Sequence, residues 1–404
     1  MLLGFLSPWL LFKVIKEALN VRSLTFLLQR FGISYRQSDE SPLWIHCASV
    51  GEVTAAGPLI DKIQTEIPGL PLMLTTTTPT GAEAVSRQWQ NIEHHYLPVD
   101  FYYAVKRFFT ATRPRAVLIL ETEIWPNMIL YARRQKIPVI TVNGRVSNRT
   151  LNTPDWLKPV YRHVLAEPDA ILCKSETDAS RYVQLGANPG VVRTIGNIKF
   201  ATATHSSSAC DIKRLFWLAA STHENEELQL CKALKNSSLL EKTLLVIAPR
   251  HPHRSLNIQQ DIAQCGLRYA VRSKSEIPDE NTHVYIADTL GEMNSWLSAA
   301  QLVFMGGSLV PVGGHNLLQP AAAGVPIISG MHLDNVSDEA ELLIEAGAMH
   351  KAESATELLS YVESLLGDTD RLTKMGQAGK QLIEQKSSLL EDYMECILPL
   401  ISLK

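Results

Sequence analysis

The sequence predicts an α/β fold made of parallel sheets with helices on both faces, and it predicts two such domains. Apolar segments of strand length alternate with amphipathic segments of helix length along most of the 404 residues, a pattern typical of parallel sheets with crossover helices. The alternation stops once, at 201–211 (ATATHSSSACD), where small polar residues show no apolar period, and then resumes. A chain of this length also exceeds what one ordinary core accommodates.

Five segments of the first half are almost wholly apolar, which indicates strands that are buried on both faces. They lie at 43–49 (LWIHCAS), 70–78 (LPLMLTTTT), 116–121 (AVLILE), 137–144 (IPVITVNG) and 170–175 (AILCKS). Helices are expected between them at 51–68, 79–90, 102–112, 126–135, 156–166 and 177–185. The segment 94–100 (HHYLPVD) precedes the helix at 102–112, and 191–197 (VVRTIGN) closes this half.

The second half repeats this order. Its expected strands lie at 214–222, 242–250, 267–273, 282–289, 302–307 and 325–330, and its helices begin near 224, 255, 291 and 316. We place the N-terminal domain at 33–200, the linker at 201–211, the C-terminal domain at 212–385 and a C-terminal helix at 386–404. Open α/β sheets bind ligands at the carboxyl ends of their strands, so we expect a cleft there, between the two halves.

The first 32 residues are expected to form a membrane-associated helical segment. The stretch MLLGFLSPWLLF is apolar, but its twelve residues are fewer than the ~20 that span a bilayer. It also lacks the charge pattern of a signal peptide. Lys13, Lys16, Arg22 and Arg30 follow among apolar residues, which favours an amphipathic helix pair on an anionic membrane surface. A helix packed on the domain is the alternative.

Composition argues against several functional classes. A formal net charge of −3 disfavours nucleic-acid binding, which requires concentrated positive charge. The six cysteines are scattered without a CxxC motif, which indicates a reducing compartment without disulfides or structural zinc. The histidines are not at metal-ligand spacing, and the GxxxxGK[ST], GxSxG and HExxH motifs do not occur. We therefore expect no metal.

The segment 305–328 (MGGSLVPVGGHNLLQPAAAGVPII) predicts a phosphate or nucleotide site. An apolar strand leads into Gly306-Gly307-Ser308, and a second pair, Gly313-Gly314, precedes His315, Asn316 and an apolar helix. Glycine allows a ligand to approach the backbone N–H groups closely, and the helix directs the positive end of its dipole to the same place. A purely structural turn is the alternative.

Ser49-Val50-Gly51-Glu52 lies where the first expected strand ends and its helix begins. Gly51 permits a tight turn there, and Glu52 falls in the first helical turn. A carboxylate at this position can act as a general base on a hydroxyl, which is worth ~10²–10⁴-fold in rate. Capping of the helix is the alternative, and the spacing alone does not separate the two.

Glu121 and Glu123 directly follow the strand at 116–121. Carboxylates beyond a buried strand are costly unless they are paired or used. We expect Glu121 to contact a ligand or to support catalysis. The alternative is that it accepts hydrogen bonds from helix N–H groups and arginines and so orders the site.

Basic residues follow several expected strand ends, and together they suggest a ligand with more than one anionic group. They are Arg145, Arg149, Lys199, Arg250 and His251. Ser221-Thr222-His223 adds hydroxyl donors after the first strand of the second half. The acidic residues that follow, Glu224, Glu226 and Glu227, are expected to serve the dipole of their helix.

Taken together and in order, these motifs resemble the bacterial 3-deoxy-D-manno-oct-2-ulosonic acid (Kdo) transferases of lipopolysaccharide biosynthesis. The resemblance covers about residues 30–385 and is carried by ASVGE (48–52), TTTTPTG (75–81), LPVD (97–100), ETEIWPN (121–127), NGRVSNR (143–149), GNIKF (196–200), ASTHENEE (220–227), APRHPHR (248–254), DTLGEM (288–293) and GGHNLLQPAAAGVP (313–326).

This resemblance implies a GT-B fold, in which two Rossmann-like domains with parallel sheets face an interdomain cleft. It also implies inverting, metal-independent transfer of Kdo from the co-substrate CMP-Kdo to the lipid A precursor, at the cytoplasmic face of the bacterial inner membrane. Matching positions make Glu52 the catalytic base and Glu121 a second important carboxylate. Donor contacts fall on Lys199, Ser221, Thr222, Arg250, His251, Gly307, His315 and Asn316. We assign acceptor or anion contacts to Ser49, Gly51, Arg145 and Arg149.

Gln319 departs from the resemblance, because the family usually carries a glutamate four residues after His315 that is suited to ribose hydroxyls. An amide can still bond a hydroxyl, so Gln319 stays among the expected donor contacts. Two other functions remain open. One is another GT-B sugar-nucleotide enzyme, such as a UDP-sugar transferase or epimerase. The other is a membrane-docked binding protein without turnover, for which Gln319 is the only support.

Overall fold

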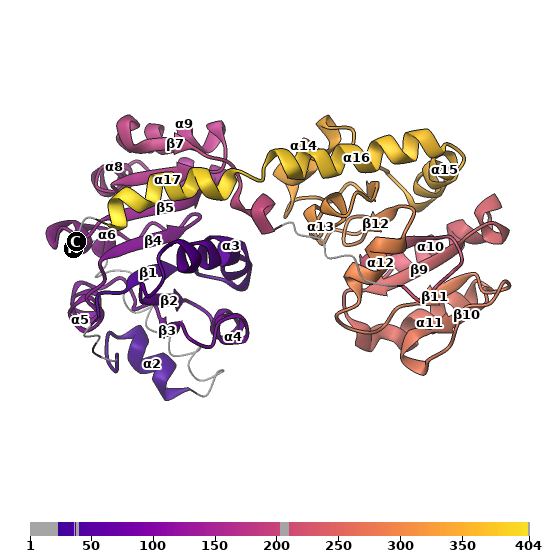
Figure 1. Cartoon of the computed structure of the whole chain (residues 1–404), viewed down its shortest axis with the longest axis horizontal. Coiled ribbons are helices and arrows are strands. Elements are labelled where there is room, and N and C mark those ends of the chain that lie inside the picture. Colours follow the sequence, from indigo (N-terminus) through magenta and orange to yellow (C-terminus); the bar gives the residue numbers. More distant parts are fainter. Residues whose placement is uncertain (1–22, 36, 38–39, 203–209, 403–404) are drawn as a thin grey trace. The chain divides into compact units, whose positions relative to one another are not determined.

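The computed structural model describes residues 23–35, 37, 40–202 and 210–402. Internal contacts divide the chain into two compact units (Figure 1). The first unit contains residues 1–202 together with 388–404, and the second contains residues 203–387. Each unit is built around one parallel sheet of seven strands.

The sheet of the first unit has the order β3-β2-β1-β4-β5-β6-β7, and all its pairs are parallel. Its strands are β1 (Leu43–His46), β2 (Leu72–Thr76), β3 (Glu93–Tyr96), β4 (Ala116–Leu120), β5 (Val139–Gly144), β6 (Ala170–Cys173) and β7 (Val192–Thr194). Every residue of β1, β2, β4, β5 and β6 is buried, as their apolar composition predicts.

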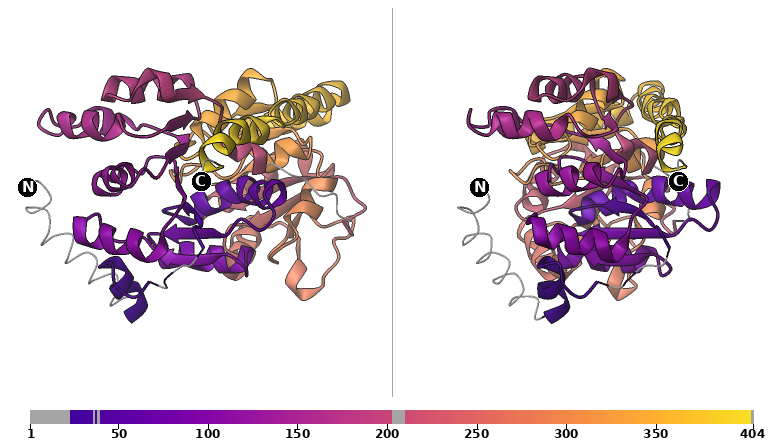
Figure 2. Two further views of the ribbon diagram at one scale, coloured as in Figure 1. Left: turned by 60° about the vertical axis from the view of Figure 1, so that its left-hand side comes forward. Right: turned by 90° about the vertical axis from the view of Figure 1, so that its left-hand side faces the viewer.

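Helices cover both faces of this sheet (Figure 2). They are α2 (Leu24–Arg30), α3 (Val50–Glu66), α4 (Pro79–Gln88), α5 (Tyr102–Thr112), α6 (Pro126–Arg134), α7 (Asn148–Leu151), α8 (Lys158–Leu165), α9 (Glu176–Leu185) and α17 (Leu389–Ile401), with a 3₁₀ turn, η2, at Ile198–Thr202. Side chains alternate across a strand, so Leu43 and Ile45 pack in a core with α3 and α17, whereas Trp44 packs with α5 and α6.

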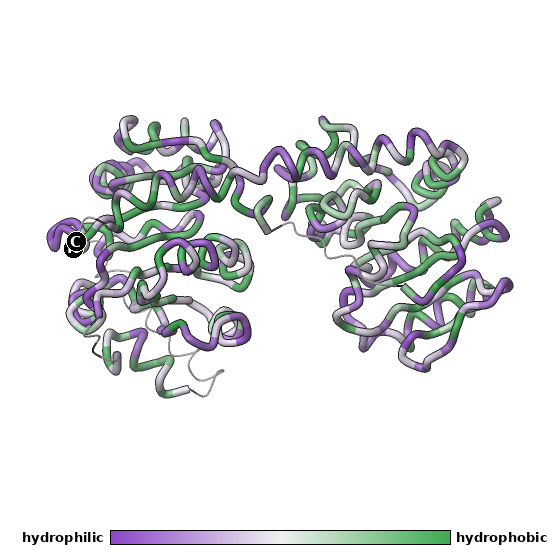
Figure 3. Tube along the Cα trace, in the orientation of Figure 1, coloured by the Kyte–Doolittle hydropathy of each residue, from purple (hydrophilic) through white to green (hydrophobic). Residues whose placement is uncertain are grey.

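The second unit has a parallel sheet in the order β10-β11-β9-β8-β12-β13-β14. Its strands are β8 (Phe216–Thr222), β9 (Leu244–Pro249), β10 (Tyr269–Val271), β11 (Val284–Ile286), β12 (Val303–Met305), β13 (Ile327–Ser329) and β14 (Met349–Lys351). Its α-helices are α10 (Glu226–Lys235), α11 (Ser255–Gln264), α12 (Met293–Ala299), α13 (Leu318–Ala322), α14 (Ser337–Glu345), α15 (Ala355–Leu366) and α16 (Thr369–Gln385). These elements confirm the predicted α/β class (Figure 3 shows the apolar strands in green).

Both sheets contain a point at which the strand order reverses. In the first unit β1 lies between β2 and β4, and in the second unit β8 lies between β9 and β12. The connections that follow the two central strands leave the same edge of the sheet toward opposite faces, and open α/β sheets bind ligands at this point. The fold therefore predicts ligand sites at the residues after β1 and β4, and after β8 and β12.

The last helix returns to the first unit. Tyr393, Ile397 and Ile401 of α17 are buried in the core formed with α3 and β1, and the Tyr393 hydroxyl donates to the Gly196 carbonyl at 2.8 Å. The sequence predicts this helix but not its attachment. Most of the expected N-terminal membrane segment, residues 1–22, lies outside the described residues. Among the helices that are described, none combines the length and hydropathy needed to cross a bilayer.

Candidate active site

Glu52 lies at the amino end of α3, two residues beyond the Val50 that opens the helix after β1. Ser49 caps the helix, and its hydroxyl both accepts from the Glu52 N–H (3.4 Å) and donates to the Glu52 carboxylate (3.1 Å). The other carboxylate oxygen accepts the Ala48 N–H at 2.7 Å. Ser49 and Glu52 thus form a capping box, in which the Glu52 side chain bonds back toward the end of β1. These hydrogen bonds fix the position of the Glu52 carboxylate.

The environment of Glu52 favours its protonated form. Burial raises the pKa of Glu52 to about 7, and the nearby charges of Glu121 and Glu123 act in the same direction, although hydrogen bonds from Ala48 and Ser49 oppose them. A carboxylate with a pKa near neutral is ionised often enough to accept a proton and basic enough to hold it. This is the property that a general base requires.

Glu121 directly follows β4 and adopts a left-handed backbone conformation, with φ of +57°. Its N–H donates to the Val142 carbonyl at 2.9 Å, and the Tyr182 hydroxyl contacts the Glu121 carbonyl at 3.3 Å. Its carboxylate lies 3.8 Å from the ammonium nitrogen of Lys199, which stands in η2. Lys199, which the resemblance assigns to the contacts of the sugar-nucleotide donor, belongs to the first unit, as predicted from its position in the sequence, and pairs with Glu121.

Asp100 is a residue of this site that sequence reasoning missed. It is 5 % exposed, and its carboxylate accepts the N–H groups of Asn127 and Met128, each at 2.9 Å. The Asn127 side-chain amide donates back to the Asp100 carbonyl at 2.6 Å. The N-cap of α6, Trp125, makes no side-chain capping bond, so Asp100 caps this helix from another loop.

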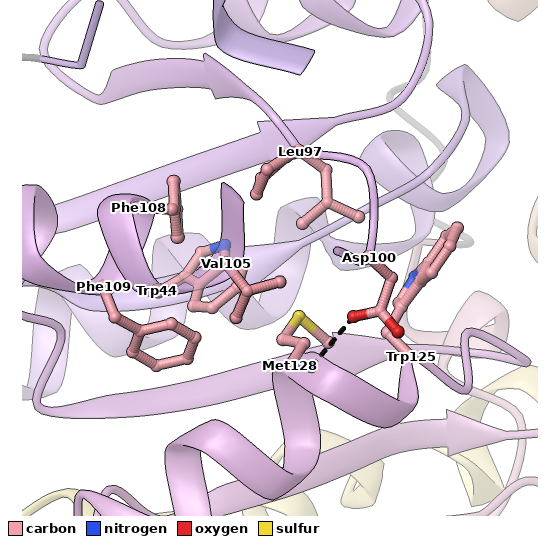
Figure 4. Close-up of a pocket in the computed structure, with 9 residues that line it drawn as sticks. Trp44, Leu97, Asp100, Val105, Phe108, Phe109, Trp125 and Met128 are labelled. Carbon is pink, nitrogen blue, oxygen red and sulfur yellow. Dashed lines mark hydrogen bonds between the residues drawn. The ribbon is translucent and has the colours of Figure 1, made fainter. Parts of the chain in front are cut away.

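The Asp100 clamp fixes the turn that carries Glu121 and Glu123, because α6 begins three residues after Glu123. Figure 4 shows Asp100 bonded to Met128 among the mostly apolar residues that line a small pocket. Burial raises the pKa of Asp100 to about 6 despite these hydrogen bonds. Two motifs in the sequence, LPVD and ETEIWPN, could have indicated this contact. Both follow strand ends, and both contain a side chain that can bond a helix terminus.

The expected acceptor contacts differ in their surroundings. Ser49 is occupied as the cap of α3, and Gly51 is exposed in its first turn. Arg145 and Arg149 are exposed after β5, and neither forms an ion pair within the described part of the chain. Both guanidinium groups are thus available to an anionic ligand of the first unit.

The second unit has a cavity of about 310 Å³ at the carboxyl ends of β8 and β12. The structure brings together there five predicted donor residues, namely Ser221, Arg250, His315, Asn316 and Gln319. Gly306 allows the two strand ends to approach, because a Cβ atom at this position would lie 2.6 Å from the Ser221 carbonyl oxygen. The Arg250 N–H donates to the Thr222 carbonyl at 3.0 Å, whereas its exposed guanidinium has no ion-pair or hydrogen-bond partner among the described residues.

The predicted backbone cradle for an anion is wrong in one respect. The N–H groups of Gly307, Ser308 and Leu309 all donate to the carboxylate of Glu226, at 2.7, 3.0 and 2.9 Å. Glu226 is fully buried and also accepts the His223 N–H at 2.9 Å. The protein thus supplies its own anion to this turn, because three backbone donors buried together need an acceptor. Glu226 was expected only to serve the helix dipole.

Thr222 was expected to contact the sugar-nucleotide donor, but its hydroxyl is bonded within the protein. It is fully buried, and its hydroxyl donates to Glu227 at 2.8 Å. Glu227 is itself buried and receives a bidentate pair from Arg254, at 2.9 and 3.2 Å. Thr222 therefore positions the loop after β8 through this buried ion pair.

Two histidines meet at the cavity. The Nε2 atoms of His223 and His315 are 2.8 Å apart, and the two rings are nearly parallel. Such an N···N hydrogen bond needs one donor and one acceptor, so only one of the two nitrogens carries a proton. Burial, together with the neighbouring His223, Arg250 and His251, lowers the pKa of His315 to about 4. His251 is exposed beside His223, with 5.8 Å between ring centroids.

Comparison with known proteins decides the family. A family model for 3-deoxy-D-manno-octulosonic-acid transferases matches residues 26–202. The 3-deoxy-D-manno-octulosonic acid transferase of Haemophilus influenzae is 32 % identical over 389 residues, which cover 92 % of this chain and 91 % of that protein. The transferase of Bordetella pertussis is 34 % identical over 359 residues, covering 84 % and 83 %. The chain belongs to the Kdo transferase family.

Solved structures agree with this family on the fold. A glycosyltransferase from Rickettsia africae covers 91 % of this Kdo transferase family member and 100 % of its own chain, with 12 % identity and a TM-score of 0.61. The UDP-GlcNAc 2-epimerase of Neisseria meningitidis covers 89 % and 100 %, with 13 % identity and a TM-score of 0.59. Together with the two parallel sheets, these neighbours confirm the GT-B class, here as two Rossmann-like units.

In this Kdo transferase family member, the predicted residues gather at the strand-order reversal of each unit. Glu52, Glu121 and Lys199 do so in the first unit. Ser221, Arg250, His315, Asn316 and Gln319 do so in the second. Gln319 donates its amide to Asn294 at 2.8 Å, and the Asn316 side chain accepts the Leu318 N–H at 3.0 Å. No group of three or more potential metal ligands occurs among the residues that the structure describes.

Proposed function

We propose that this protein transfers Kdo from CMP-Kdo to a glucosamine hydroxyl of the lipid A precursor, lipid IVA, with inversion and with Glu52 as the general base. The observation that carries the proposal is the raised pKa of Glu52, about 7, at the strand end where the family's base falls. Glu52 takes the proton of the acceptor hydroxyl as its oxygen attacks the anomeric carbon of Kdo. The bond from that carbon to the CMP phosphate oxygen breaks, and CMP leaves with the electron pair.

Glu121 and Lys199 support this step in our proposal. The charge of Glu121 raises the pKa of Glu52, so it makes Glu52 a stronger base. Lys199 lies 3.8 Å from Glu121, and this ion pair holds the Glu121 carboxylate in place beside the base. Arg145 and Arg149 are the cations that would meet the phosphates of the acceptor.

The cavity of the second unit is proposed to hold CMP-Kdo. Arg250 is an unpaired guanidinium at its rim, and His223, His251 and His315 stand beside it. These groups would stabilise the charge that develops on the single phosphate of the leaving CMP. Because one phosphate leaves, we propose that the reaction is metal-independent, so chelators should leave the rate unchanged.

We further propose that the protein works at the cytoplasmic face of the inner membrane. The acceptor of this reaction is a lipid, and the apolar and basic pattern of residues 1–32 is suited to an anionic membrane surface. This assignment rests on the sequence pattern and on the chemistry of the proposed acceptor.

The decisive experiment is a transfer assay with radiolabelled CMP-Kdo and lipid IVA on the wild type, Glu52→Gln and Glu52→Asp. Glu52→Gln should lower the rate by ~10²–10⁴-fold, since it removes the base, and should leave CMP binding unchanged in calorimetry. Glu52→Asp keeps a carboxylate and should recover part of the rate. An unaltered rate in Glu52→Gln would refute the base assignment.

The same assay separates the alternative functions. Thermal protection by UDP-sugars, without protection by CMP, would instead favour a UDP-sugar enzyme. Binding of CMP-Kdo without turnover in the wild type would favour a binding protein.

A further inference from the structure

A basic hollow lies at the opposite edge of the first sheet from Glu52 and Glu121. It has a volume of about 340 Å³, and its wall includes Arg113, Arg115, Thr110 and the aromatic residues Phe109 and Tyr131. Arg115 immediately precedes β4, whereas Glu121 immediately follows it. The length of the strand therefore separates Arg115 from Glu121 by roughly 20 Å.

Two arginines give the hollow its charge. Arg113 caps the carboxyl end of α5, is exposed, and forms no hydrogen bond or ion pair through its side chain within the described residues. Arg115 donates its Nε to the Ser41 carbonyl at 3.0 Å, which fixes its stem. No carboxylate of the described chain pairs with either guanidinium. Unneutralised arginines at a concave surface favour a phosphate-like ligand, which a guanidinium can bind in a bidentate manner.

Aromatic and apolar side chains form part of the floor of the hollow. Phe109 and Ile137 are 4 % and 9 % exposed, and the ring of Tyr131 lies 5.1 Å from that of Phe109. Tyr131 also contacts Tyr102, with 6.1 Å between centroids. A free inorganic anion would use the arginines but gain nothing from this floor, whereas an amphiphile would use both.

The outer surface of α5 extends the hollow. Tyr102, Lys106 and Arg113 are all exposed and follow one another at intervals of four and seven residues, so they form one stripe that ends at the hollow. Tyr102 and Tyr103 are 41 % and 76 % exposed, and Lys106 is exposed beside them. Tyrosine with lysine or arginine in one stripe is typical of a surface that lies at the membrane–water interface.

We propose that this hollow binds the headgroup phosphate of an anionic phospholipid, between Arg113 and Arg115, with the start of the acyl chains against Phe109 and Tyr131. The site goes beyond the proposed transfer reaction, because its lipid is not the acceptor and lies at the other edge of the sheet. Its role is to hold the first unit on the bilayer.

The test measures sedimentation of the full chain with phosphatidylcholine vesicles that contain, or lack, phosphatidylglycerol. Each arginine near an anionic surface contributes about fivefold in binding. Arg113→Gln should therefore weaken binding to the phosphatidylglycerol vesicles about fivefold, and Arg113→Gln/Arg115→Gln about twenty-five-fold. Circular dichroism and thermal unfolding establish that each variant is folded. Wild-type binding by the double variant would overturn the proposal.

The matched control removes two exposed lysines from α16 of the second unit, Lys374→Gln/Lys380→Gln. It changes the net charge equally and should bind as the wild type, and an equal loss would mean that bulk charge alone drives binding. Calorimetry with a short-chain phosphatidylglycerol and with inorganic phosphate separates the sources of phosphate, and equal affinities would overturn the assignment to a lipid. Transfer to detergent-dispersed lipid IVA should be unaltered in the double variant, so the lipid site is judged independently of the reaction.

Discussion

Glu52 is both a helix cap and the candidate base, and the two roles pull its pKa in opposite directions. Hydrogen bonds from Ala48 and Ser49 stabilise the carboxylate, whereas burial and the charges of Glu121 and Glu123 oppose ionisation and prevail. An exposed carboxylate that capped a helix would have a pKa at or below its ordinary value, whereas burial opposes ionisation. Burial, together with the carboxylates after β4, therefore distinguishes Glu52 from an exposed cap.

The raised pKa of Glu52 predicts the pH dependence of the reaction. The base must be ionised, so kcat/KM should rise with pH along a limb centred near pH 7. Glu123→Gln removes one of the charges that raise this pKa, so the limb should move to lower pH. The measurement is the pH–rate profile of both proteins with CMP-Kdo and lipid IVA. Glu83→Gln, an exposed change on α4, serves as the control and should leave the limb in place. A limb that is unaltered by Glu123→Gln would contradict the electrostatic account.

At the scale of elements, one helix and one glycine turn depend on carboxylates from elsewhere in the chain. Asp100 caps α6 across 27 residues, and Glu226 at the start of α10 binds the glycine turn after β12 across more than 80 residues. In both cases a buried carboxylate satisfies backbone N–H groups that would otherwise lack partners. Each carboxylate thus couples the position of a site loop to a distant element.

Replacement of Asp100 should loosen the turn that carries Glu121. Asp100→Ala leaves the Asn127 and Met128 N–H groups without acceptors, so we expect a loss of about 2 kcal/mol in the free energy of unfolding. We also expect a fall in kcat. Asp100→Asn keeps an acceptor oxygen and should recover part of both. Urea unfolding and the transfer assay provide the measurements, and an unaltered kcat in a destabilised Asp100→Ala would limit Asp100 to stability.

Replacement of Glu226 should disturb the donor cavity. In Glu226→Gln an amide N–H₂ would face backbone donors, so we expect a loss of about 2–3 kcal/mol in stability and weaker CMP binding. Glu224→Gln lies on the same connection, is exposed, and should change neither quantity. Thermal unfolding and CMP calorimetry test this expectation. Full CMP affinity in Glu226→Gln would show that the glycine turn is not part of the donor site.

At the scale of the whole molecule, the chain leaves the first unit near Thr202 and returns to it at Ser388. The return buries Tyr393, Ile397 and Ile401 in the first core. The stability of the first unit therefore depends on the last residues of the chain, although the whole second unit intervenes in the sequence.

Truncation of a buried α17 side chain should act on the first unit. Ile397→Ala creates a cavity in its core and should cost about 2–5 kcal/mol there. Hydrogen exchange should consequently accelerate in β1, α3 and α17. The exposed Glu395→Ala on the same helix is the control. Faster exchange confined to the sheet of the second unit would contradict this assignment of α17.

Several features were predictable because their signals are local. Apolar strands and amphipathic helices are recognised from the periodicity of their residues, so the sequence predicted the α/β class and nearly every central strand. Ser49 and Glu52 are three positions apart, so the position of this cap after a strand could also be predicted from the sequence. Family membership followed from motifs in order.

Other features required the tertiary structure, because a buried polar group does not encode its partner locally. The sequence predicted that the backbone N–H groups of the glycine turn would bind a ligand anion, but they donate to Glu226. It also predicted that Thr222 would contact the ligand, but the Thr222 hydroxyl donates to Glu227. The sequence likewise did not predict that Lys199 pairs with Glu121. The sequence by itself determined the elements, their order and the chemical groups at the strand ends. Only the folded chain decided which of those groups satisfy one another and which stay open to a ligand, since that choice depends on distances between residues far apart in the sequence.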